Sequence, residues 1–177
     1  QIKYAQWRDD APADQSQIAF YGQGWNHVVR FDTLAATYLP LVNNESGSDL
    51  LTIDYSSTSR RLYLAYEDGL IKYVDLVTGD EFEFVSGISN LDTIVVTGTN
   101  VIVQTKSATE YTHRIFNAAG GEGVNGLTDA SDFNLKDAFW DDATARLYGF
   151  KQEVGQSITN LGFVNVDEAN NRLNGDI

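Results

Sequence analysis

Hydrophobic and polar residues alternate along short runs over most of the chain, and turn-forming residues separate the runs. The clearest series comprises 50–56, 61–67, 70–76 and 81–85, interrupted by Ser/Thr, Asp-Gly and Thr-Gly turns. A period of two places successive side chains on opposite faces of a β-strand. Asp-Gly between two such runs is a strong hairpin signal that favours a type I′ turn. This stretch predicts four antiparallel strands.

The pattern recurs with a period in the low forties. An Asp or Asn closes an alternating run at Asp32, Asp75 and Asn117, which lie 43 and then 42 residues apart, and a further copy has its marker near 165. A repeat of this length built from short strands is typical of a β-propeller blade. The repeat therefore predicts the architecture, although propellers carry many unrelated functions.

A second marker supports the same period. Arg-Leu-Tyr at 61–63 recurs at 146–148, two periods later. The other copies match less fully, since 93–117 predicts three strands and a loop near 153–156 lengthens the last copy. We expect residues 1–177 to form an all-β propeller domain or segment. It would have about four blades of four antiparallel strands, the first blade being incomplete.

The chain also carries signs of being part of something larger. It contains no methionine and opens on Gln1 in alternating sequence, so a processed product or a piece of a longer protein is expected. Propellers have four to eight blades, and an open one leaves unpaired sheet edges that invite association. The expected partners are other protein chains or the remaining blades of a longer chain.

Composition narrows the function classes. Twelve Lys and Arg against twenty-five Asp and Glu give a net charge of −13, which opposes binding to nucleic acid or to anionic membranes. No run of eighteen apolar residues occurs, so membrane insertion is not expected. The absence of cysteine excludes a disulfide framework, a thiolate metal site and a cysteine nucleophile. Acidic, thiol-free composition favours an extracellular or cell-surface location.

Residues 56–80 also carry a family resemblance. They read as a small-polar turn, a strand, an Asp-Gly turn and a strand that ends in D-x-x-T-G. This pattern resembles the blades of bacterial β-propellers of the YVTN, TolB-like and quinoprotein-like kinds. The resemblance implies a propeller fold and a role as a binding or scaffolding surface. The tryptophan-rich consensus of quinone-dependent dehydrogenases is missing after Gly79, so their activity is not implied.

Catalytic signals are weak. The two histidines, His27 and His113, lie 86 residues apart within expected strands. They either line a pocket at equivalent positions or pack between blades. No G-x-S-x-G elbow accompanies them, and two histidines cannot build a three-histidine zinc site. The sequence therefore leaves enzymatic activity open without favouring it.

Carboxylates are plentiful, and one segment concentrates oxygen donors. Asp167, Glu168 and Asn170 lie in the segment 165–176 and are weak candidates for a calcium site. The segment lacks the D-x-D-x-D-G pattern of an EF-hand loop. The alternative is that these side chains are solvated loop residues. No cofactor other than calcium is expected.

Tryptophans supply the remaining binding signal. Trp25 follows a glycine-rich turn near His27, and Trp140 precedes the acidic Asp141. Tryptophans at loop mouths stack on sugars or anchor protein interfaces. The alternative is that each one caps a blade core. Trp25, His27, Trp140 and Asp141 are the candidate ligand-binding residues.

Two functions follow as hypotheses. The first is a non-catalytic binding module of a larger secreted or cell-surface protein, which mediates protein–protein association or adhesion through blade edges and loops. The second is a carbohydrate-binding or glycoside-processing propeller, with a central cleft lined by Trp25, Trp140 and nearby aspartates.

Overall fold

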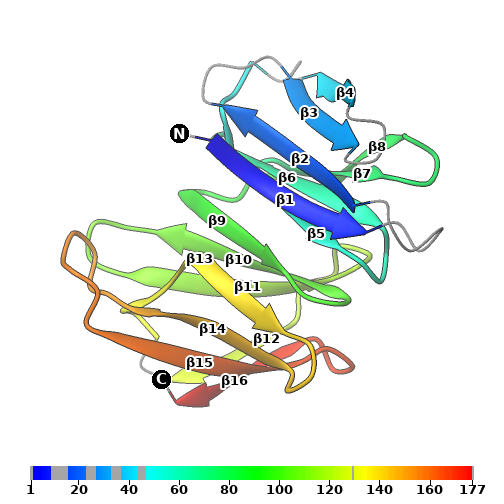
Figure 1. The fold of residues 1–177 in the computed structure, drawn as a ribbon. Coiled ribbons are helices and arrows are strands. Elements are labelled where there is room, and N and C mark those ends of the chain that lie inside the picture. Colours follow the sequence, from blue (N-terminus) through cyan, green and yellow to red (C-terminus); the bar gives the residue numbers. More distant parts are fainter. Residues whose placement is uncertain are drawn as a thin grey trace. The chain divides into compact units, whose positions relative to one another are not determined.

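The computed structural model describes residues 2–8, 16–22, 27–32, 37–43, 47–128 and 130–176. Every regular element in these residues is a β-strand, so the predicted all-β class is confirmed (Figure 1). The strands form four sheets, here named A to D in chain order. The chain divides into two compact units, Gln1–Ser86 with sheets A and B, and Gly87–Ile177 with sheets C and D. Within the described residues, no helix has the length and apolar character that a membrane crossing requires.

Both sheets of unit 1 have the four strands of the template, so the expectation that the first blade is incomplete is wrong. Sheet A comprises β1 (Ile2–Arg8), β2 (Ser16–Gly22), β3 (His27–Asp32) and β4 (Thr37–Asn43). Sheet B comprises β5 (Leu50–Ser56), β6 (Arg61–Tyr66), β7 (Ile71–Asp75) and β8 (Glu81–Val85). Each strand pairs antiparallel with the next one in sequence.

The two sheets of unit 1 share an apolar core. Ala19 and Val28 of sheet A cluster with Leu62, Leu64 and Val74 of sheet B, and all five are buried. The alternation predicted for β6 and β7 explains this, because Leu62 and Leu64 lie on one face of β6. Burial of each large aliphatic side chain contributes about 1.5–3 kcal/mol. Sheet A thus covers one face of sheet B.

The Asp-Gly hairpin between β6 and β7 forms as predicted, but its turn is not of type I′. Gly69 has a φ of 83°, whereas Asp68 is absent from the residues with positive φ. The Gly69 N–H donates to the Tyr66 carbonyl (3.0 Å) and the Tyr66 N–H to the Leu70 carbonyl (2.9 Å). This is a type I turn followed by a left-handed glycine, the usual three-residue hairpin. Asp68 uses its carboxylate to accept the Leu70 N–H (3.1 Å).

Unit 2 departs from the four-strand template. Sheet C has three strands, β9 (Leu91–Val96), β10 (Asn100–Lys106) and β11 (Tyr111–Asn117). Sheet D has five, in the order β12 (Val124–Thr128), β16 (Arg172–Asp176), β15 (Asn160–Asp167), β14 (Arg146–Lys151) and β13 (Phe133–Asp141). The strand that would complete sheet C, β12, instead pairs parallel with β16.

The switch of β12 depends on a close backbone contact. A Cβ on Gly123 would lie 1.8 Å from the Asn171 carbonyl oxygen, so only glycine fits there. The Gly123 N–H donates to the Ile115 carbonyl (2.8 Å). The Asn125 side chain donates to the His113 carbonyl (2.9 Å). These two bonds satisfy carbonyls on the outer edge of β11, where a fourth strand would otherwise pair.

Sheets C and D also share a core. Val95, Ile102 and Ile115 of sheet C cluster with residues of sheet D that include Leu147 and Val164. The β-branched side chains of sheet C suit a pleated surface that is buried. The loop predicted near 153–156 lies between β14 and β15 and accounts for the longer last repeat.

The repeat markers all fall at the same structural position. Asp32, Asp75 and Asn117 are the last residues of β3, β7 and β11, and the equivalent strand β15 ends at Asp167. The fourth marker therefore lies two residues beyond its predicted place near 165. Each marker ends the third strand of its repeat.

The marker side chains hold the turn that follows. Oδ1 of Asp75 accepts two backbone N–H groups of its turn at 2.8 and 3.3 Å. Oδ1 of Asn117 does the same at 3.0 and 3.0 Å. Asp and Asn favour turns because their short side chains bond to the backbone in this way. The need for this acceptor explains why the repeat tolerates either Asp or Asn.

The Arg-Leu marker has an equally local cause. Arg61-Leu62, Arg146-Leu147 and a third pair, Arg172-Leu173, each begin a strand after a tight turn. Sequence comparison missed the third pair because Asn174 replaces the tyrosine. The turn residue before each pair has a positive φ, namely Arg60 (55°), Ala145 (52°) and Asn171 (51°). The three leucines are fully buried.

The capping role of Asp75 is testable by substitution. Asp75→Ala removes the acceptor for two N–H groups and should lower the free energy of unfolding by about 1–2 kcal/mol. Asp75→Asn keeps Oδ1, as Asn117 does one repeat later, and should lose less than half as much. Urea titration followed by far-UV circular dichroism measures both. Equal losses in the two variants would show that Asp75 acts through its charge and not through the cap.

Candidate functional site

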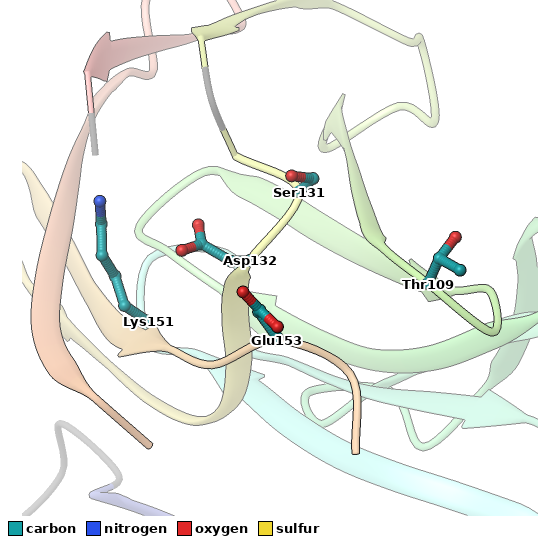
Figure 2. Close-up of a pocket in the computed structure, with 5 residues that line it drawn as sticks. All are labelled: Thr109, Ser131, Asp132, Lys151 and Glu153. Atoms are coloured by element: carbon teal, nitrogen blue, oxygen red, sulfur yellow. The ribbon is translucent and has the colours of Figure 1, made fainter. Parts of the chain in front are cut away.

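A polar cleft of about 370 Å³ opens at one end of unit 2. Three chain connections line it, namely the β10–β11 turn, the segment before β13, and the start of the loop after β14. Its lining residues are Thr109, Ser131, Asp132, Lys151 and Glu153. In Figure 2, Asp132 and Glu153 lie between Lys151 on one side and Thr109 on the other.

Hydrogen bonds fix the backbone of each connection. Ser107 Oγ accepts the Thr109 N–H (3.2 Å) and so shapes the β10–β11 turn. The Ser131 carbonyl accepts the Tyr111 N–H of β11 (2.9 Å). The Asp132 carbonyl accepts the N–H of Gln152, which lies between the cleft residues Lys151 and Glu153 (2.6 Å). The segment before β13 is therefore tied on both sides.

The cleft offers hydrogen bonding and charge. Two carboxylates (Asp132 and Glu153), one ammonium (Lys151) and two hydroxyl groups line the cleft. Carboxylates form their strongest hydrogen bonds with cationic groups. Neither an aromatic ring nor a histidine is among the lining residues. The arrangement suits binding of a polar ligand that offers hydrogen-bond donors.

His113 is a buried structural residue. Only 2% of it is exposed, and its Nε2 lies 2.9 Å from the Phe133 carbonyl oxygen. Because a carbonyl only accepts, Nε2 carries the proton and Nδ1 does not. Nδ1 has no hydrogen-bond partner among the described residues. Burial lowers the pKa of His113 from 6.5 to about 4, and the bond to Phe133 opposes this only in part.

A buried amide network joins this histidine to the cleft. The Gln104 side chain donates to Asn134 Oδ1 (3.0 Å) and accepts the Leu135 N–H (2.7 Å), and its Oε1 lies 3.3 Å from His113 Nε2. Asn134 in turn donates to Gln152 Oε1 (2.6 Å). Buried polar groups of this kind hold one geometry when they are satisfied. The network thus fixes the segments that carry Asp132, Lys151 and Glu153.

Trp140 and Asp141, the two predicted ligand-binding residues whose side chains are described, do not line the cleft. Trp140 is half-buried and packs against the core of unit 2, and its Nε1 is buried without a partner among the described residues. Asp141 accepts a backbone N–H (3.1 Å) and a threonine hydroxyl (2.6 Å) of the following turn. Trp25 lies outside the described residues, and His27 is described only as the first residue of β3.

Two of the calcium candidates, Asp167 and Glu168, accept hydrogen bonds from the protein. Asn170 donates to Asp167 through its side chain (2.8 Å) and backbone (3.2 Å), and these bonds hold the pKa of Asp167 below its ordinary value. Glu168 accepts instead from the Thr97 hydroxyl and from the Thr99 N–H (2.8 Å) of sheet C. In the part of the chain that is described, no three His, Cys, Asp or Glu residues are grouped as metal ligands. Calcium binding stays a prediction.

The cleft itself was missed by sequence reasoning. Its residues form no motif, since they come from three separate connections. The available signals were the three strands predicted in 93–117, which require a turn close to Thr109, and the predicted loop near 153–156, which contains Glu153. Both signals indicate loops, where binding residues are common. Neither signal shows that these loops come together in the folded chain.

Comparison with known proteins supports the fold. No known protein family and no curated protein matches the chain. A chain in "Crystal Structure of Mitotic Checkpoint Complex" matches 76% of this chain with a TM-score of 0.59 and 10% identity. A chain in "Crystal structure of Nidogen/Laminin Complex" matches 87% with a TM-score of 0.61 and 10% identity.

Both matched chains are β-propellers, so the chain has the predicted propeller fold. At 10% identity the likeness shows the fold alone. This chain spans 41% and 57% of the length of the two matched chains. Residues 56–80 resemble a bacterial propeller repeat. The comparisons support the propeller fold that this resemblance implies, but they do not identify the bacterial repeat type.

The neutral state of His113 generates a pH prediction. Its pKa is about 4 when folded and about 6.5 when unfolded, so between these values the unfolded chain binds more protons. This contribution to stability is fully present above pH 6.5 and is lost as the pH falls towards 4. His113→Gln keeps a donor for Phe133 but does not titrate. As the pH falls from 6.5 to 4, the free energy of unfolding of the unsubstituted chain should decrease by up to about 3 kcal/mol more than that of the variant.

The comparison uses urea unfolding at half-unit pH steps from 7.5 to 4. Carboxylate titration is common to both chains, so only the difference between the two curves reports on His113. Parallel curves would contradict a buried neutral imidazole.

Proposed function

We propose that this chain is a non-catalytic binding module that associates with another protein through the polar cleft of unit 2. The cleft carries the proposal because it gathers two carboxylates, two hydroxyls and one ammonium on connections that are hydrogen-bonded in place. A pre-organised site avoids part of the entropic cost of binding. The lining residues offer charge and hydrogen bonding, which suit recognition of a polar group.

Charge indicates the chemistry of the partner. The chain has a net charge of −13, and carboxylates outnumber the ammonium in the cleft. A partner segment that presents Lys or Arg beside backbone or side-chain amides would complement both features. Complementary charge raises the rate of association and selects partners. The sugar-binding alternative has less support, because the described residues that line the cleft include no aromatic ring on which a sugar could stack.

The wider setting is part of the proposal. Both matched propellers come from structures of protein complexes, as their titles state, and this is consistent with a role in association. We place the chain within a larger secreted or cell-surface protein and assign it a part in adhesion or assembly. The acidic, cysteine-free composition is compatible with such a location.

The cleft can be tested without a known partner. A random peptide library displayed on phage is selected against the chain, and the selected peptides should be enriched in Lys and Arg. Their affinity should fall about tenfold or more for the double variant Asp132→Asn with Glu153→Gln, since each charge-assisted bond contributes about 1.5–3 kcal/mol. The affinity should also fall with added salt.

The matched control is Glu67→Gln with Asp80→Asn, which changes the net charge equally at exposed positions of unit 1. Its affinity should change less than twofold. An array of glycans probed in parallel covers the alternative function. Peptide binding that ignores the cleft substitutions would refute the proposal, and cleft-dependent glycan binding without peptide binding would favour the carbohydrate hypothesis.

A further inference from the structure

A β-hairpin begins between β11 and the segment that follows it, and then stops. Phe116 and Glu122 form an isolated antiparallel bridge. The Gly123 N–H donates to the Ile115 carbonyl (2.8 Å), as the next bond of an antiparallel pair would. Beyond Gly123 the chain forms β12 and pairs with β16 instead. The hairpin therefore has a defined register that β12 does not use.

This register can be continued along β11. It places Asn125 opposite His113, and Leu127 opposite Tyr111. Residues that lie opposite each other share one face of the sheet. Tyr111 and His113 are buried, so the continued hairpin would put Leu127 on the buried face of sheet C. In the observed structure Leu127 also packs against the core of unit 2, so both arrangements bury it.

The Asn125 side chain already stands in for part of this pairing. Its Nδ2 donates to the His113 carbonyl (2.9 Å). In an antiparallel pair the bonds recur at every second residue, so the bond from Gly123 to Ile115 would be followed by one from the Asn125 backbone N–H to the His113 carbonyl. The side-chain amide thus occupies the place of its own backbone donor.

His113 has a nitrogen that the observed arrangement does not satisfy. The residue is 2% exposed, and its Nδ1 has no hydrogen-bond partner among the described residues. Nδ1 is the unprotonated nitrogen and therefore needs a donor. In the continued hairpin Asn125 would lie beside His113 on the buried face, and its amide would be free to donate to Nδ1. An unsatisfied buried acceptor favours an arrangement that supplies its donor.

Two glycines allow β12 to pair with β16. Neither Gly123 nor Gly126 has a positive φ, so the backbone conformation does not require glycine at either position. A Cβ would lie 1.8 Å from the Asn171 carbonyl oxygen at position 123, and 2.9 Å from the Leu173 carbonyl oxygen at position 126. Both glycines therefore serve the close approach to β16. Pairing with β11 does not involve this approach.

We propose that β12 exchanges between two sheet edges, pairing with β16 in the observed state and with β11 in a second state. The exchange would change sheets C and D from three and five strands to four strands each. The backbone bonds that β12 loses at one edge are replaced at the other. A segment with two packings of similar free energy can act as a conformational switch.

The exchange reaches the cleft through one hydrogen bond. In the observed state the Tyr111 N–H donates to the carbonyl of the cleft residue Ser131 (2.9 Å). In the second state the register gives this N–H to the Leu127 carbonyl. Ser131 and the adjoining Asp132 then lose their bond to β11, so the cleft should bind more weakly. This consequence rests on the proposed function of the cleft, whereas the exchange itself does not.

The acceptor of the Tyr111 amide can be identified by NMR from scalar couplings across hydrogen bonds. Coupling to the Ser131 carbonyl carbon reports the observed state, and coupling to the Leu127 carbonyl carbon reports the second state. In the unsubstituted chain, saturation-transfer experiments should detect the second state as a minor population at the amides of β11 and β12.

Gly123→Ala should make the second state the major one, because a Cβ at this position excludes the approach to β16. The Tyr111 coupling should move from Ser131 to Leu127. The matched control is Val124→Ala, which changes an exposed neighbour and should keep the coupling to Ser131.

A disulfide variant keeps the test decisive if Gly123→Ala does not fold. Thr112→Cys with Gly126→Cys joins residues that lie opposite each other in the second state, at a pair without backbone bonds, where the Cα atoms lie about 4.5 Å apart and suit a disulfide. The oxidised chain should show the coupling to Leu127. It should bind the peptides selected at the cleft about tenfold or more weakly than the unsubstituted chain.

Retention of the Ser131 coupling in folded Gly123→Ala would overturn the proposal. Free solvent exchange of the amides of 124–128 in the oxidised disulfide variant would also overturn it, because β12 would then pair with neither edge. The same holds if the unsubstituted chain shows no second state. If no peptide binds the cleft in any variant, the proposed function fails while the couplings still decide the exchange, so the two proposals fail separately.

Discussion

Burial of one sheet face against the next is the constraint on which this structure depends. Each unit has one core between two sheets, with Leu62, Leu64 and Val74 in unit 1, and Ile102 and Leu147 in unit 2. A face that carries such side chains contributes to stability only when it is removed from water, at about 1.5–3 kcal/mol for each large aliphatic side chain. The repeat therefore specifies a sheet that packs against another sheet. The turns and side-chain caps place the apolar residues on the face that is packed.

The turns serve this packing by setting the register of the strands. A one-residue slip would move Leu62 and Leu64 to the opposite face. The positive φ before each Arg-Leu pair and the side-chain caps at Asp75 and Asn117 fix where each strand starts and ends. These devices are local, so they recur in the sequence and reveal the repeat. For the same reason the strands of sheet B were predicted to within a residue or two.

What could not be predicted depends on contacts between distant segments. Nothing in the alternation of 124–128 shows that β12 pairs with β16, because the cause is the approach of Gly123 to Asn171. Trp140 was a candidate either for ligand binding or for capping a blade core, and in the structure it packs against the core of unit 2. The cleft was missed because Thr109, Asp132 and Lys151 converge only in the fold.

The most direct test of this account is amide hydrogen exchange in unit 2, resolved by residue. If the core between sheets C and D holds both sheets, the central amides of β10 and β14 should exchange only when the unit unfolds and should give the same free energy of exchange. Sheet edges should exchange faster. A difference of more than about 2 kcal/mol between the central amides of β10 and β14 would contradict the account, because each sheet would then be stable without the other.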